Sequence, residues 1–231
     1  MKRTVLAVAF AAMASAQVQN FKPVTEEMLR NPSPNDWLSF SRTLDAQRFS
    51  PLNQINKANV KNLSLAWSRG LGTQNSESIP IVHDGVMFVA TPGSQVIAIE
   101  ASTGTVLWRY RRPLAPTVIN RHPTTRGVGL LGNKVFLAAS DAVLLALDVR
   151  TGRTVWSATV ADNRGGHYMS LAPLVANGKV LVGTSGGELG IRGFIAAFDP
   201  DTGKELWRTY TVPAPGEPGS ETWPKGDQWK T

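Results

Sequence analysis

Short runs of apolar residues recur along the chain and are separated by turn-forming residues. Three of these runs, Val96–Ile99, Leu144–Leu147 and Phe194–Phe198, each lead into an acidic residue and a Thr-Gly pair. Because glycine accepts a positive φ and a carboxylate accepts backbone N–H groups, this pattern predicts a tight turn between two antiparallel strands. Four residues after each glycine comes a tryptophan, namely Trp108, Trp156 and Trp207.

The motif A-x-[DE]-x-x-T-G-x-x-x-W therefore occurs three times, with its tryptophans 48 and 51 residues apart. Upstream of each hairpin, a further pair of strands is predicted around turns rich in Gly, Asn and Asp. These pairs are Ile79–Val82 with Val86–Ala90, Gly127–Leu131 with Lys134–Ala138, and Ala172–Ala176 with Lys179–Gly183. Four strands in a repeat of about 40–50 residues are typical of a β-propeller blade. We therefore predict an all-β propeller fold with about three blades, in which the tryptophans pack between adjacent blades.

The N-terminus has the pattern of a targeting signal. A cationic start is followed by an apolar run from Val5 to Met13 and by small residues before Gln17. The run is shorter than the about 20 residues of a membrane-spanning helix, and the order of features is that of a secretory signal peptide. We predict a signal peptide over residues 1–16 and a periplasmic mature protein without stable membrane insertion. An N-terminal membrane anchor is the alternative.

The segment before the repeats is less regular. Residues 17–66 are expected to be mostly irregular, with a short helix starting after Thr25, whose hydroxyl can cap it. Leu63–Trp67 is predicted to form one extra strand, and residues 67–231 are assigned to the propeller.

Composition narrows the classes of function. The chain has no cysteine, which excludes disulfides, zinc–thiolate sites and iron–sulfur clusters. The net charge of +7 becomes +5 without Lys2 and Arg3, and no run of Lys and Arg exceeds two residues, so nucleic-acid binding is not predicted. The three histidines lie in separate turns without i, i+4 spacing, which argues against a histidine metal site.

Four stretches carry a family resemblance: Asp36–Ser39 with Arg48–Leu52, Gln54–Leu63 with Trp67, Ser185–Gly193, and Glu221–Trp223 with Gly226–Asp227 and Trp229–Lys230. Together they resemble the N-terminal part of the pyrroloquinoline quinone (PQQ)-dependent alcohol dehydrogenases, the methanol and ethanol dehydrogenase group of eight-bladed quinoprotein propellers. The resemblance implies PQQ-dependent oxidation of a small primary alcohol to an aldehyde. It also implies a Ca²⁺ or lanthanide ion and a cytochrome c or similar electron acceptor, and it leaves a homodimer open.

The resemblance assigns a cofactor site as well. Arg126 matches the arginine beside the quinone oxygens, where a guanidinium can donate two hydrogen bonds. Glu188 matches the carboxylate that binds the metal, a hard oxygen ligand suited to Ca²⁺. From the residues alone, Arg126 could equally pair with a surface carboxylate, and Glu188 could be a solvated loop charge. The other expected cofactor-binding residues are Glu77, Ser170, Ser185, Gly186 and Gly187.

Two departures from the family pattern accompany these matches. Many members place a disulfide over the cofactor plane, whereas the corresponding stretch here is Asn120–Pro123. Either Arg121 or His122 covers the quinone instead, or the site is altered. The family's catalytic aspartate, its second metal ligand and its stacking tryptophan lie beyond Thr231. We therefore expect an incomplete, truncated enzyme sequence without turnover of its own, and we assign no catalytic residue. A non-catalytic propeller scaffold for protein interaction is the alternative.

Overall fold

The computed structural model describes residues 17–72, 75–119, 121–226 and 228–230. The predicted signal peptide and Asn120 lie outside these residues. Strands dominate the described part, which has one short α-helix and several single-turn 3₁₀ segments. In this part of the chain, no helix has the length and apolar character needed to cross a membrane.

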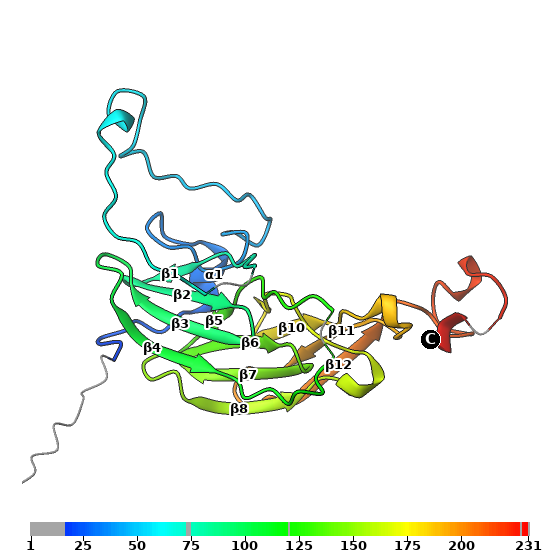
Figure 1. Cartoon of the computed structure of the whole chain (residues 1–231). Helices are drawn as coiled ribbons and strands as arrows, with labels where there is room; N and C mark the ends of the chain where they lie inside the picture. Colours follow the sequence, from blue (N-terminus) through cyan, green and yellow to red (C-terminus); the bar gives the residue numbers. More distant parts are fainter. Residues whose placement is uncertain (1–16, 73–74, 120, 227, 231) are drawn as a thin grey trace, which may run out of the picture.

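Three four-stranded antiparallel sheets follow one another along the chain (Figure 1). In each sheet the order of the strands is their order in the sequence, which confirms the predicted all-β, propeller-type fold. The first blade is β1 (Ile81–His83), β2 (Val86–Thr91), β3 (Gln95–Glu100) and β4 (Val106–Arg111). The second is β5 (Gly129–Leu131), β6 (Lys134–Ala139), β7 (Val143–Asp148) and β8 (Thr154–Thr159). The third is β9 (Leu174–Ala176), β10 (Lys179–Gly183), β11 (Phe194–Phe198) and β12 (Glu205–Tyr210).

The first strand of every blade begins two residues later than the sequence pattern suggested. In the first and third blades, β1 starts directly after Pro80 and β9 directly after Pro173. Proline has no N–H to donate to a neighbouring strand, so the ladder can begin only after it. In the second blade, Gly127 has φ +151° and stands outside the extended geometry of β5.

A tryptophan joins each blade to the next one. Trp108 of β4 donates from Nε1 to the carbonyl of Val149 at 2.8 Å, and a Cβ on Gly152 would lie 2.5 Å from its ring. Trp156 makes the same contacts with the turn at Gly203. Packing of tryptophans between blades is thus confirmed for both residues. Trp207 is 40% exposed, and no glycine of the described residues packs on its ring.

The prediction of an extra strand over Leu63–Trp67 was wrong. This segment is extended, but it joins no sheet, and Leu65 is 81% exposed. A strand needs a hydrogen-bonded neighbour, and no strand of the described residues lies beside this segment. Trp67 nevertheless packs on Gly104 and donates from Nε1 to the carbonyl of Ala101 at 3.0 Å, which repeats the contact between blades.

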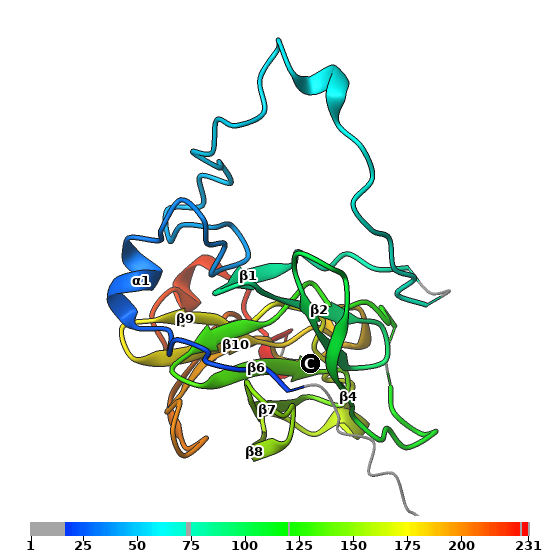
Figure 2. The same ribbon diagram turned by 90° about the vertical axis from the view of Figure 1, so that its left-hand side faces the viewer.

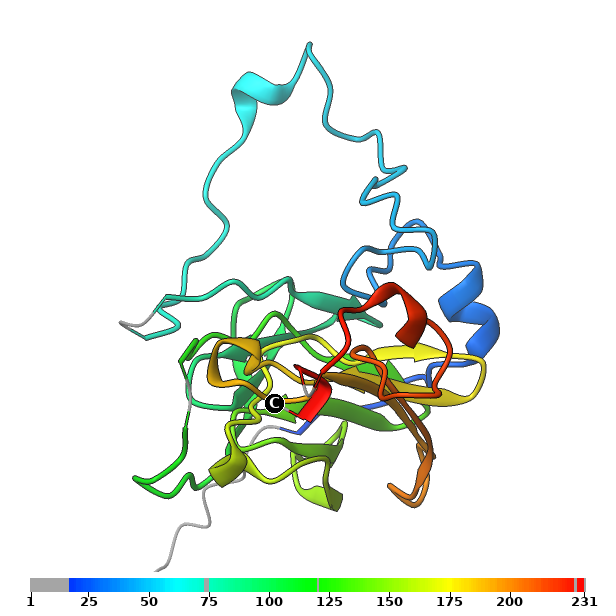
Figure 3. The same ribbon diagram turned by 90° about the vertical axis from the view of Figure 1, so that its right-hand side faces the viewer.

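The N-terminal segment divides into a packed and a projecting part. Helix α1 (Glu26–Arg30) starts where predicted, because Thr25 Oγ1 accepts a hydrogen bond from the Met28 N–H at 3.2 Å. Residues 17–38 add Val18, Phe21 and Leu29 to the main core. By contrast, residues 44–66 rise away from the sheets, as Figures 2 and 3 show, and expose most of their large apolar side chains.

The acidic residue of the repeat stabilises its turn, and its effect should depend on pH. The Asp199 carboxylate accepts hydrogen bonds from Thr202 N at 2.8 Å, Thr202 Oγ1 at 2.9 Å and Asp201 N at 3.0 Å, and the bonds from Thr202 hold its pKa below the usual range. A carboxyl with a lowered folded-state pKa stabilises the fold above its unfolded pKa, and this stabilisation is lost as the pH falls. Asp199→Ala should therefore lower the free energy of unfolding at neutral pH, and the difference from wild type should shrink below about pH 4. Urea unfolding at several pH values measures this difference, and a constant difference would contradict the expectation.

Candidate quinone site

Three of the predicted site residues lie in loops that lead into the first strands of the three blades. Glu77 precedes β1, Arg126 precedes β5 and Ser170 precedes β9. The stretch Ser185–Glu188 follows β10 of the third blade. The propeller repeat therefore places three of these stretches at corresponding positions of neighbouring blades, and the fourth lies between β10 and β11 (Phe194–Phe198) of the third blade.

Direct contacts bring three of these residues together. Arg126 Nη2 lies 3.0 Å from Glu77 Oε2, and Arg126 Nη1 donates to Ser170 Oγ at 2.8 Å. The backbones are linked as well, because Arg126 N donates to the carbonyl of Ser170 at 3.0 Å and Ile79 N donates to the carbonyl of Arg126 at 3.1 Å. Ser170 is buried, whereas the side chains of Arg126 and Glu77 are 39% and 43% exposed. A half-exposed guanidinium is thus held in place with part of its surface open to a ligand.

Arg121 and His122, from the stretch that corresponds to the family's disulfide, also lie near this cluster. His122 Nε2 lies 3.7 Å from Glu77 Oε1. Arg121 and His122 both help to lower the pKa of Glu188, although their contributions are secondary. The positive charges of Arg121 and Arg126 suit an anionic ligand such as a tricarboxylate.

The Ser185–Glu188 loop is fastened to the third blade through Tyr168. Tyr168 N donates to the carbonyl of Ser185 at 3.1 Å, and Ser185 N donates back to the carbonyl of Tyr168 at 2.8 Å. Gly186 follows with φ +124°, and a Cβ there would lie 2.3 Å from the carbonyl oxygen of Gly166. Only glycine, which has no side chain, fits at this position. Gly187 then begins the 3₁₀ turn η3 (Gly187–Leu189), which carries Glu188.

Tyr168 also holds the Glu188 side chain. Its phenol donates to Glu188 Oε1 at 2.6 Å. This hydrogen bond is the largest cause of a lowered pKa for Glu188. Burial, followed by the same hydrogen bond, raises the pKa of Tyr168 to about 12. At neutral pH the pair therefore consists of a neutral phenol and an ionised, exposed carboxylate.

Three buried hydroxyls close in sequence to the site residues have no hydrogen-bond partner among the described residues. They belong to Ser78, Thr124 and Thr184, which are close in sequence to Glu77, Arg126 and Ser185 respectively. Buried polar groups are rarely left unpaired, so this set fits a ligand rich in carboxylate and carbonyl oxygens. Among the described residues, no group of three or more His, Asp and Glu side chains could hold a metal ion.

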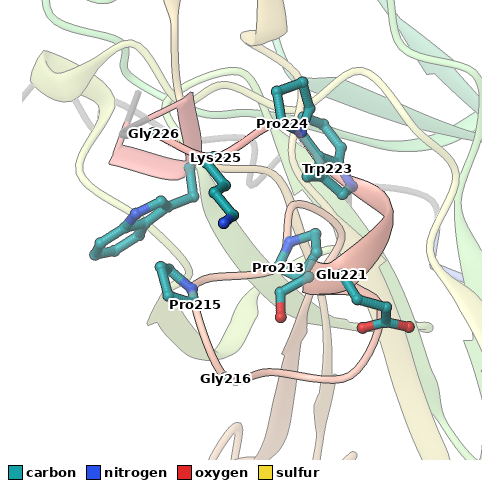
Figure 4. Close-up of a pocket in the computed structure, with 10 residues that line it drawn as sticks. Pro213, Pro215, Gly216, Glu221, Trp223, Pro224, Lys225 and Gly226 are labelled. Carbon is teal, nitrogen blue, oxygen red and sulfur yellow. The ribbon is translucent and has the colours of Figure 1, made fainter.

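One cavity borders Arg126, and another lies in the C-terminal segment. One, of about 360 Å³, has Arg126 in its wall together with residues of the segment 39–46 and of the segment 171–174. The other, of about 550 Å³, lies in the C-terminal segment and is shown in Figure 4. Its lining extends from Pro213 to Trp229 and includes none of the predicted site residues.

Fold and site together define a quinoprotein-type propeller, and comparison with known proteins gives the family. Residues 37–231 match the PQQ family described as "Glucose/ethanol/alcohol dehydrogenase, beta-propeller domain", and the chain belongs to this family. It is 40% identical over 241 residues to the quinohemoprotein alcohol dehydrogenase ADH IIB of Pseudomonas putida, a match that covers 97% of this chain and 34% of that protein. It is 39% identical over 220 residues to the dehydrogenase subunit of the alcohol dehydrogenase (quinone) of Gluconobacter oxydans, covering 85% of this chain and 29% of that protein.

Solved structures agree with this assignment. The quinohemoprotein alcohol dehydrogenase of Comamonas testosteroni superimposes with a TM-score of 0.76 at 38% identity, covering 84% of this chain and 30% of that one. A europium-containing methanol dehydrogenase gives a TM-score of 0.80 at 32% identity, covering 89% of this chain and 40% of that one. The chain thus spans about a third of the length of the curated relatives it matches.

The sequence interpretation missed Tyr168. It contacts a predicted site residue 20 positions away, and no repeat or motif marks it. Its only sequence signal is its place two residues before Ser170, in the loop that leads into β9. The roles of the seven predicted site residues remain predictions, while their arrangement in space is a result of the structure.

Proposed function

We propose that this chain forms one side of the PQQ site of a periplasmic dehydrogenase that oxidises a primary alcohol to an aldehyde. The observation that carries the proposal is the contact set of Glu77, Arg126 and Ser170, which aligns predicted cofactor residues from three blades. The curated relatives are named alcohol dehydrogenases, which supports the alcohol as the substrate class.

The described residues would have different roles in binding PQQ. Ser170 and Glu77 fix the plane of the Arg126 guanidinium, which then presents its remaining N–H donors to ligand oxygens. The unpaired hydroxyls of Ser78, Thr124 and Thr184 would accept or donate further hydrogen bonds. When bound, PQQ supplies a two-electron acceptor. These residues therefore bind and orient, and no base is assigned to any of them.

Glu188 would hold the metal ion of this site. Its exposed, ionised carboxylate suits Ca²⁺ or a lanthanide, which prefer oxygen ligands. The europium-containing relative supports a lanthanide as one candidate. The chain alone should show no turnover. A cytochrome c or a similar protein is the proposed electron acceptor.

Loss of the Arg126 guanidinium should weaken PQQ binding. Arg126→Leu removes a charge-assisted donor, which is worth about 1.5–3 kcal/mol, or about a 10- to 150-fold rise in Kd. Quenching of tryptophan fluorescence during PQQ titration measures the affinity. Arg109→Leu is the matched control, because Arg109 is an exposed arginine of β4. Equal affinities of the two variants, or no saturable binding to the wild-type chain, would contradict the proposal.

A further inference from the structure

Tyr168 touches the candidate metal ligand directly, and the proposed function gives it no role. Its phenol donates to Glu188 Oε1 at 2.6 Å, across 20 residues of sequence. We propose that Tyr168 is a positioning residue, which fixes the Glu188 carboxylate in the orientation that receives the metal ion. This inference rests on the proposed function, because it needs a cation at Glu188.

The two side chains differ strongly in how firmly they are held. Tyr168 is 4% exposed, lies next to the fully buried Met169 and is bonded through both its N–H and its carbonyl to Ser185. Glu188 sits on the exposed turn η3, and the Tyr168 phenol is the main hydrogen-bond donor to its carboxylate. Fixing a free glutamate side chain in one orientation costs rotamer entropy. The hydrogen bond from the phenol already fixes the side chain in the absence of metal, so metal binding need not order it.

The chemistry of the donor suits this task. A neutral phenol orients the carboxylate without neutralising its negative charge, whereas a lysine or arginine would repel an incoming cation. A carboxylate has about four lone-pair sites on two oxygens, so one hydrogen bond to Oε1 leaves Oε2 open for coordination. Arg121 and His122 lie within electrostatic reach of Glu188 and would draw a free carboxylate toward them. Tyr168 opposes this displacement.

Partners of this kind that hold a metal ligand commonly change metal affinity by about 10- to 100-fold when they are removed. The test compares the wild-type chain with Tyr168→Phe, Glu188→Gln and the control Tyr110→Phe, on a tyrosine of β4. Each protein is titrated with Tb³⁺, with and without PQQ, and Ca²⁺ is used as a competitor. Luminescence lifetimes in H₂O and D₂O report the number of water molecules bound to Tb³⁺. Thermal unfolding followed by circular dichroism shows whether each variant is folded.

Tyr168→Phe should raise the Tb³⁺ Kd about tenfold or more and add coordinated water, because the released carboxylate gives way to solvent. Tyr110→Phe should leave both values unchanged. Wild-type affinity and hydration in Tyr168→Phe, with binding lost in Glu188→Gln, would overturn the role of Tyr168 while the metal site stands. Equal binding by wild type and Glu188→Gln would overturn the metal site and this inference together.

A second substitution of Glu188 distinguishes the positioning role of Tyr168 from a folding defect in Tyr168→Phe. Glu188→Asp keeps the charge but shortens the side chain by one methylene, which takes the carboxylate out of reach of the phenol. If Tyr168 acts by positioning the carboxylate, adding Tyr168→Phe to Glu188→Asp should produce little further loss of affinity. Fully additive losses would instead indicate independent structural effects and would contradict the inference.

Discussion

Replacement of Trp108 by alanine should lower the free energy of unfolding by about 3–5 kcal/mol, the usual cost of removing a large buried aromatic side chain. Trp108 is 7% exposed and packs against Phe88, with their ring centroids 5.9 Å apart. Its indole also fills the space above Gly152 and satisfies the carbonyl of Val149. The substitution would open a cavity between two blades and leave that carbonyl without its partner.

The chain provides its own control for this prediction. Trp207 occupies the same position of the repeat in the third blade, but it is 40% exposed and no glycine of the described residues packs on its ring. Trp207→Ala should therefore change the free energy of unfolding much less than Trp108→Ala. Urea unfolding followed by circular dichroism measures both variants. Similar losses in the two would show that packing between blades is not what the tryptophans contribute.

Alanine at Gly186 should disrupt the loop that carries Glu188. The φ of +124° is one that residues with a Cβ rarely adopt, and such strain costs about 1–3 kcal/mol. The added methyl would also lie 2.3 Å from the carbonyl oxygen of Gly166, which is backbone and cannot rotate away. We expect Gly186→Ala to destabilise the fold by at least the strain energy and to weaken Tb³⁺ and PQQ binding, because the loop must shift.

Gly187 is the matched control for Gly186. A Cβ at Gly187 would have no atom within 4 Å, so Gly187→Ala should fold like the wild-type chain. Chemical unfolding of the two variants gives the comparison. Equal behaviour of both would mean that the close approach of Gly186 to Gly166 does not determine the shape of this loop.

The elements of the blades could be predicted because their signals are local. Apolar runs of four to six residues, Thr-Gly turns and a spaced tryptophan are read from neighbouring positions, and the structure places strands within about two residues of each prediction. The signal for the N-terminal helix was also local, because the Thr25 hydroxyl caps the helix. The strand over Leu63–Trp67 failed for the opposite reason, because its existence depends on a neighbour that the segment itself does not encode.

By itself, the sequence determined the repeat, the family resemblance and the residue types of the candidate site. Only the tertiary structure decided which of these residues meet. The pairing of Arg126 with Glu77 and Ser170 bridges 49 and 44 residues, and Tyr168 reaches Glu188 across 20. The contacts of Arg126 depend on how the blades stack, through the tryptophans that lie on the glycines of the following turns. The contact of Tyr168 depends on the backbone pairing of Tyr168 with Ser185 within the third blade. Periodicity within one strand records neither, which is why Tyr168 emerged only from the fold.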